Sequence, residues 1–115
     1  MACGACSIRE EDGSDWIDFY VPMGALGTAY PARGFPFGTE SDWPGPWRQE
    51  VEDWLAAIGR WVSQSASFRL ALIGHEVCRE AYAAHIAAQG IPAERFFGYL
   101  WPSGGSVIYH PRNAE

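Results

Sequence analysis

Lysine is absent from this 115-residue sequence, so all eight basic residues are arginine. Its absence excludes Schiff-base chemistry on a lysine amine, and it also excludes a lysine clamp for phosphate groups. The glycine-rich phosphate loops G-x-x-x-x-G-K-S/T and G-x-G-x-x-G are missing as well. The sequence therefore lacks the usual signs of a nucleotide-dependent enzyme.

Long apolar runs are missing too. No segment approaches the ~18–20 apolar residues of a membrane span, and the first residues lead into charges without the apolar stretch of a signal peptide. The three cysteines are an odd number, which argues against a disulfide-stapled secreted domain. We therefore expect a cytoplasmic protein without a membrane partner. The Ala-, Gly- and Arg-rich composition indicates high-GC codon usage and a bacterial source.

Acidic residues outnumber basic ones by fourteen to eight, which gives a net charge of −6 and a pI near 4.9. Such a chain repels phosphate backbones, so we expect no nucleic-acid partner. Residues 1–57 hold ten acids and three arginines, for a charge of −7, whereas residues 58–115 hold four acids and five arginines, for +1. This uneven distribution predicts one acidic surface in the first half of the chain.

The length and the globular composition predict a single domain over residues 1–115. Residues 1–15 are small, polar and acidic, which is typical of a flexible N-terminal lead-in. The aromatic and β-branched residues 16–21 predict a strand. Residues 22–46 form a long loop rich in glycine, proline and aromatic residues, far longer than an ordinary connection.

The strongest periodic pattern predicts a helix that begins at Pro46 and stops at Ser63 to Ser67. Its apolar stripe consists of Trp47, Val51, Trp54, Leu55, Ile58, Trp61 and Val62.

The second half of the chain predicts a buried strand over residues 68–74, a helix over 75–89, and strands over 95–101 and 106–110 around a turn at 102–105. The resulting order is β-loop-α-β-α-β-β. We expect an α/β (or α+β) fold in which a four-stranded mixed sheet packs with two helices. Three strands of that sheet are expected to be parallel, and the last is expected to be an edge hairpin strand.

His75 and Cys78 are the candidate catalytic residues. They open the predicted helix at the end of a strand, where ligands tend to bind in open α/β sheets. A helix N-terminus can lower the pKa of a cysteine thiol, and His75 could act as its base. The alternative is that Cys78 is a small core residue and that His75 caps the helix. A phosphatase loop is absent, because position 84 is Ala84.

A second candidate is a zinc site formed by Cys3, Cys6, His75 and Cys78, which together are a complete Cys₃His set of ligands. The two pairs are far apart in the sequence, so the alternative is an ordinary N-terminus with exposed thiols. No other cofactor is expected.

The third candidate is a protein-binding surface, in which aromatic side chains anchor a basic protein partner and carboxylates steer it. The alternative is that the tryptophans cover the core and that the carboxylates are a solvated helix start. The candidate residues are Phe35, Phe37, Glu40, Asp42, Trp43, Trp47, Glu50 and Asp53.

We favour the third candidate among the functions. The sequence predicts a small acidic binding protein, comparable in class to bacterial immunity proteins and toxin inhibitors, that recognises a basic protein through the loop and the start of the first helix. The alternatives are a small enzyme that uses Cys78 and His75, and a zinc-stabilised domain without catalysis. The sequence gives no indication of the oligomeric state.

Overall fold

The computed structural model describes residues 4–11, 13–20, 46–75, 77 and 79–114. The chain divides into two compact units, Met1–Gly45 and Pro46–Glu115, and each is described by itself. The predicted loop at residues 22–46 lies outside the described residues except for Pro46. The described part of the chain contains no helix that is both long and apolar enough to cross a membrane.

The first unit contains a β-hairpin. Strand β1 (Gly4–Arg9) pairs antiparallel with β2 (Asp15–Tyr20), so that Cys6 lies opposite Asp18. The strand predicted at 16–21 is thus confirmed, and the segment predicted as a flexible lead-in at 1–15 contains the strand β1, which its composition did not predict. The small residues of β1 carry little strand propensity, and their order comes from pairing with the aromatic β2.

The hairpin is closed at its turn by backbone and side-chain contacts. The Glu10 amide donates to the Ser14 carbonyl at 2.9 Å, and the Gly13 amide donates to the Glu10 carbonyl at 3.0 Å. Beside the turn, Arg9 and Asp15 form a two-pronged ion pair with N–O distances of 2.7 and 3.0 Å. Both side chains are exposed, so this pair fixes geometry more than it adds stability.

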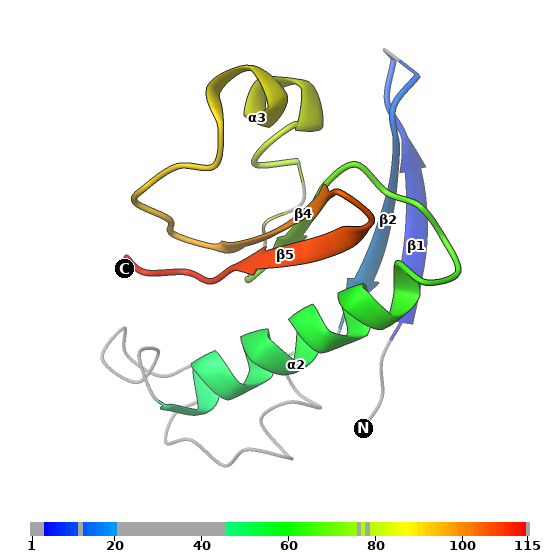
Figure 1. The fold of residues 1–115 in the computed structure, drawn as a ribbon. Helices are drawn as coiled ribbons and strands as arrows, with labels where there is room; N and C mark the ends of the chain where they lie inside the picture. The colour runs from blue at the N-terminus through cyan, green and yellow to red at the C-terminus, as the bar shows by residue number, and fades with distance from the viewer. Residues whose placement is uncertain (1–3, 12, 21–45, 76, 78, 115) are drawn as a thin grey trace. The chain divides into compact units, whose positions relative to one another are not determined.

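The second unit combines helix α2 (Pro46–Val62) with a three-stranded sheet of β3 (Ala71–Ile73), β4 (Gly98–Ser103) and β5 (Ser106–His110). The predicted first helix is therefore confirmed. Figure 1 shows α2 along one side of this sheet and helix α3 (Ala83–Gln89) on the opposite side. Ala56, Ile73 and Leu100 form the buried centre, and the half-buried residues packed around it are Leu55, Phe68, Ala71, Val107 and Tyr109.

Both sheets in the described part of the chain are antiparallel, in the orders β1-β2 and β3-β4-β5. The predicted four-stranded mixed sheet with three parallel strands is therefore wrong, although a small α+β domain agrees with the structure. The first predicted strand belongs to a different sheet from the others. Strands β3 and β4 run antiparallel, so their connection is not the right-handed crossover that the prediction assumed.

The second helix is shorter than the predicted 75–89. It begins at Ala83 because the preceding backbone is not helical: Arg79 has a φ of 64°, and Tyr82 is extended with φ −127° and ψ 142°. A left-handed arginine interrupts a right-handed helix. The alanine-rich composition that favours a helix therefore produces one only after this interruption.

The predicted β4–β5 hairpin is confirmed, but β4 begins at Gly98 and runs to Ser103, so the turn is shorter than the predicted 102–105. Strand pairing places Ser103 opposite Ser106, which leaves the two glycines as the connecting residues. Gly104 has a φ of 58° and Gly105 a φ of 86°. Two-residue hairpin turns of type I′ need positive φ at both central positions, and glycine adopts such values without steric penalty.

Helix α2 approaches the sheet most closely at Gly59. A Cβ atom added there would collide with Cδ1 of Leu100, whose side chain is fully buried. The neighbouring core residue Ala56 is also small and buried. Small residues on the inner side of α2 thus let the helix backbone rest directly on the central strand.

Gly59→Ala tests this close approach. Helix propensity alone predicts a gain of about 1 kcal/mol in the free energy of unfolding. We expect instead a loss of about 1–3 kcal/mol, because the added methyl group overpacks the core against Leu100. Urea denaturation measures the change.

A double-mutant cycle with Leu100→Ala is the control. In the Leu100→Ala background the clash is gone, so the same glycine substitution is expected to be neutral or stabilising. Equal effects in the two backgrounds would contradict the proposed contact.

Candidate functional site

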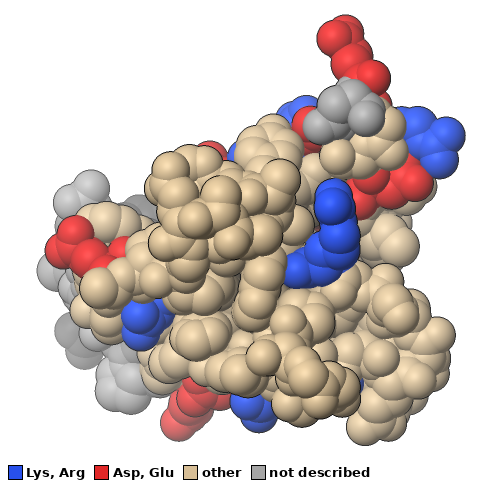
Figure 2. Space-filling model, turned by 45° about the horizontal axis from the view of Figure 1, so that its top comes forward, with Lys and Arg blue, Asp and Glu red and all other residues tan. Residues whose placement is uncertain are grey.

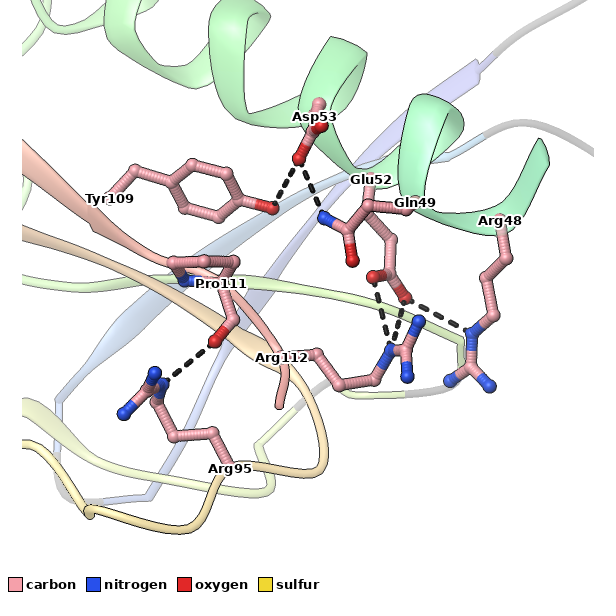
Figure 3. Close-up of polar contacts among 8 residues, drawn as sticks. All are labelled: Arg48, Gln49, Glu52, Asp53, Arg95, Tyr109, Pro111 and Arg112. Atoms are coloured by element: carbon pink, nitrogen blue, oxygen red, sulfur yellow. Dashed lines mark hydrogen bonds and ion pairs between the residues drawn. The ribbon is translucent and has the colours of Figure 1, made fainter. Parts of the chain in front are cut away.

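A buried ion cluster joins α2 to the C-terminal segment. Glu52 is only 4% exposed, and its carboxylate receives Arg48 Nε at 3.2 Å and Arg112 Nε at 3.2 and 3.4 Å (Figure 3). Arg48 lies one helical turn before Glu52, whereas Arg112 comes from the end of the chain. Two cations thus compensate one buried anion, which is the condition under which a carboxylate can leave water.

Tyr109 makes a second contact between the sheet and α2. Its hydroxyl donates to Asp53 Oδ1 at 3.1 Å, and the same oxygen accepts from Gln49 Nε2 at 2.7 Å (Figure 3). The guanidinium of Arg60 lies 5.9 Å from the centre of the tyrosine ring. Burial raises the pKa of Tyr109 well above its usual range, and the Asp53 and Glu52 carboxylates raise it further. The phenol is therefore a hydrogen-bond donor at neutral pH.

Arg95 holds the C-terminal segment from the other direction. Its Nε donates to the Pro111 carbonyl at 2.8 Å, and its Nη1 donates to the Pro92 carbonyl at 3.0 Å. The Asn113 side chain accepts from the Arg95 amide at 2.7 Å and donates to the Ala93 carbonyl at 2.8 Å. The polar groups near the chain end thus fasten backbone segments together, which indicates a structural role.

The predicted partner-binding residues divide into two groups. Trp47 lies in α2, with its side chain outside the description, and Glu50 and Asp53 are exposed on the same helix. The alternative interpretation, a solvated helix start, does not hold for Glu52, because that carboxylate is buried and paired with two arginines. The five others lie outside the described residues: Phe35, Phe37, Glu40, Asp42 and Trp43.

The predicted junction of strand and helix at His75 and Cys78 is wrong. His75 is exposed, and α3 begins only at Ala83, so among the described residues no helix begins at position 75 as the prediction required. Cys78 itself lies outside the described residues. A catalytic role for the pair stays a prediction and has lost the helix dipole that was its physical reason.

Two of the four predicted zinc ligands also lie outside the described residues. Cys3 and Cys78 are not described, whereas Cys6 is a free, exposed cysteine on β1 whose Sγ lies 4.0 Å from Asp18 Oδ2. Among the described residues, no group of three or more His, Cys, Asp or Glu is placed to hold a metal ion. The zinc site stays a prediction.

The structure also exposes large apolar side chains on α2 and on the hairpin. On α2, Trp54 is 44% exposed and Trp61 71% exposed. On the hairpin, Ile17 is 79% exposed and Phe19 43%. The sequence does indicate that Trp54 and Trp61 lie together, since tryptophan recurs every seven residues at positions 47, 54 and 61 and such residues share a helix face. The apolar stripe of α2 is too wide for one sheet to cover.

Comparisons with protein-family models, with curated proteins and with solved structures found no match. In the view of Figure 2, charged side chains are scattered and broad areas carry neither an acidic nor a basic residue. The exposed apolar residues of the hairpin and of α2 are therefore the candidates for a contact surface.

Glu52→Gln tests the buried ion cluster. The amide keeps the shape of the side chain but removes the charge that compensates Arg48 and Arg112. We expect a loss of about 3 kcal/mol in the free energy of unfolding, measured by urea denaturation, because two partly buried arginines lose the buried counter-charge of Glu52. The exposed Glu50→Gln is the matched control and should change stability by less than about 0.5 kcal/mol. Similar losses for both variants would show that burial of Glu52 has no energetic consequence.

Tyr109→Phe tests the contact between the sheet and α2. At neutral pH the variant should lose about 1 kcal/mol of stability, since the hydrogen bond to Asp53 disappears. The pKa of Tyr109 is raised in the folded state, so above about pH 10 the unfolded chain releases this proton while the folded protein retains it. The stability of the wild type should therefore fall above about pH 10.

The variant should lose less stability than the wild type between pH 8 and 11, as followed by urea denaturation. A residual fall is expected from Tyr99, whose pKa burial also raises. The exposed Tyr82→Phe is the control for the loss of a tyrosine. Identical pH profiles for the wild type and Tyr109→Phe would contradict the assignment.

Proposed function

We propose that this protein binds a basic protein partner, in the manner of an immunity protein or inhibitor, and that the β1–β2 hairpin is a principal contact surface. The observation that carries the proposal is the exposure of Ile17 and Phe19 on a hairpin within the more acidic unit. Residues 1–45 hold seven acids and two arginines, a charge of −5, whereas residues 46–115 hold seven acids and six arginines, a charge of −1.

The strand register supports an apolar contact face on the hairpin. Side chains alternate along a strand, so Ile17 and Phe19 lie on one face with their partners Ser7 and Ala5. Because Ser7 and Ala5 are small, the two larger side chains stand out from this face. Such isolated large apolar groups are the kind of residue that carries binding energy at protein interfaces.

Charge supplies the second part of the argument. Glu11 is exposed beside the turn, and Asp18 lies between Ile17 and Phe19 on β2, with its side chain on the opposite face of the hairpin. Carboxylates around an apolar contact favour a cationic partner and accelerate its association. On α2, Glu50 and Asp53 remain exposed, but Glu52 is already paired with two arginines. The helix start therefore contributes less negative charge than its sequence implies.

A cytoplasmic location is part of the same proposal. Cys6 is free and exposed, and three cysteines cannot all form disulfides within one chain. A reducing compartment would keep such a thiol unmodified.

The test is affinity capture on the immobilised full chain from a lysate of the source organism at low salt, followed by mass spectrometry and by titration with the purified partner. We expect a basic protein that is released when the salt is raised, since screening weakens the charge contribution. Glu11→Arg/Asp18→Arg should weaken binding at least about tenfold and flatten its dependence on salt.

Two further variants separate hairpin recognition from general charge. Glu80→Arg/Glu94→Arg changes two exposed acids of the other unit and raises the net charge by the same four units, from −6 to −2, so it should bind nearly as the wild type does. Ile17→Thr keeps a β-branched strand residue but removes the apolar anchor, and it should weaken binding without changing the dependence on salt. Capture of no basic protein, or equal loss in both double variants, would refute the proposal.

A further inference from the structure

The outer face of α2 has a self-complementary arrangement of side chains. Trp54 and Trp61 are exposed one heptad apart, and the small, exposed Ala57 lies between them. Seven residues fall only ~20° short of two full helical turns, so the two tryptophans form a nearly straight row along the helix, and Ala57, three residues after Trp54, lies about 60° to one side of Trp54. Two large groups with a small one at the midpoint are a pattern that a second, inverted copy can match.

Charges beside this row repeat with the same spacing. Asp53 directly precedes Trp54, and Arg60 directly precedes Trp61, so the two lie along one border of the aromatic row. Both hydrogen bonds that Asp53 accepts use Oδ1, and a carboxylate has a second oxygen to offer. Arg60 is exposed beside the Tyr109 ring and has five N–H donors. One helix thus carries an acid and a base on the same border.

We propose that this face of α2 binds a second copy of the chain, with the two helices antiparallel. A two-fold axis that crosses between Ala56 and Ala57 brings Asp53 of one copy to the level of Arg60 of the other, and it does so twice. Flanking charges of this kind set the partner and the orientation in paired helices. The order of charges along the border favours the antiparallel pair, because residues of one border face the same border of the partner only when the two helices are antiparallel.

The same register also fits the apolar side chains. At 1.5 Å per residue, it sets Trp54 about 3 Å along the axis from Trp61 of the second copy, within reach of ring-to-ring contact. The two Ala57 residues meet near the two-fold axis, where a larger side chain would hold the helices apart. Charge pairing and packing therefore select one register independently of each other. The short aromatic row makes a small interface, so the dimer is weak and concentration-dependent.

Sedimentation equilibrium of the full chain tests the proposal. The mass of the wild type should rise from 12.7 kDa toward twice that value as the concentration increases to about 1 mM. Asp53→Arg and Arg60→Asp should each weaken association at least about tenfold, since each sets like charges opposite one another. An equimolar mixture of the two variants should regain it, because every contact is then between opposite charges.

Substitution of Asp53 also removes its hydrogen bond with Tyr109 inside the unit. Ala57→Glu tests association without changing that hydrogen bond. The position is exposed, so the chain should fold, but two carboxylates at the axis should prevent association. Ala87→Glu, on the exposed side of α3, is the matched control and should associate like the wild type. A wild type that stays at 12.7 kDa, a mixture that regains nothing, or an Ala57→Glu variant that still associates would each overturn the proposal. None of these outcomes bears on the hairpin, so the proposed function stands or falls separately.

Discussion

The buried carboxylate of Glu52 sets the orientation of α2 in the second unit. It lies between Arg48, one turn earlier on α2, and Arg112, near the chain end, and each contact is within 3.4 Å. Because an unpaired charge would be strongly unfavourable in this place, the helix cannot turn Glu52 outward without also releasing Arg112. Residues advance by ~100° each along a helix, so with Glu52 inward Trp54 lies ~200° away, on the outer side. The same ion cluster that closes the unit therefore exposes its tryptophans.

The elements with local sequence signals could be predicted, and their arrangement could not. Proline at a first helical position, followed by a 3.6-residue pattern, was sufficient for the helix Pro46–Val62. Two glycines between alternating residues were sufficient for the last hairpin. The direction of β3 relative to β4 depends on how the 24 residues between Ile73 and Gly98 return to the sheet, and the alanine-rich pattern there overstated the helix. The left-handed Arg79 has no signal in composition.

The candidate site shows the same limit at the level of single residues. Glu50, Glu52 and Asp53 are three carboxylates in four positions, but one is buried with two arginines, one accepts from a tyrosine, and one is exposed. The partner that distinguishes Glu52 is 60 residues away in the sequence. Helical spacing places Glu52 on the side of Val51 and Ala56. Because α2 carries apolar residues around so much of its circumference, the sequence alone does not show that this is the buried side. Burial of a charge is decided by a distant counter-charge, which a local pattern does not contain.

The distribution of charge separates the two kinds of recognition that we propose for this chain. By halves of the sequence the charges are −7 and +1, but by structural units they are −5 and −1, so the helix start belongs to the nearly neutral unit. A strongly acidic unit attracts cations over about a Debye length, ~8–10 Å, and repels its own kind over the same range. Two copies of a chain with a charge of −6 therefore need a contact face that is locally neutral. The border of α2 meets that condition, because Asp53 and Arg60 cancel each other there. The two proposals, an acidic hairpin for a cationic partner and a balanced helix for a like copy, both rest on the same uneven placement of eight arginines and fourteen acids.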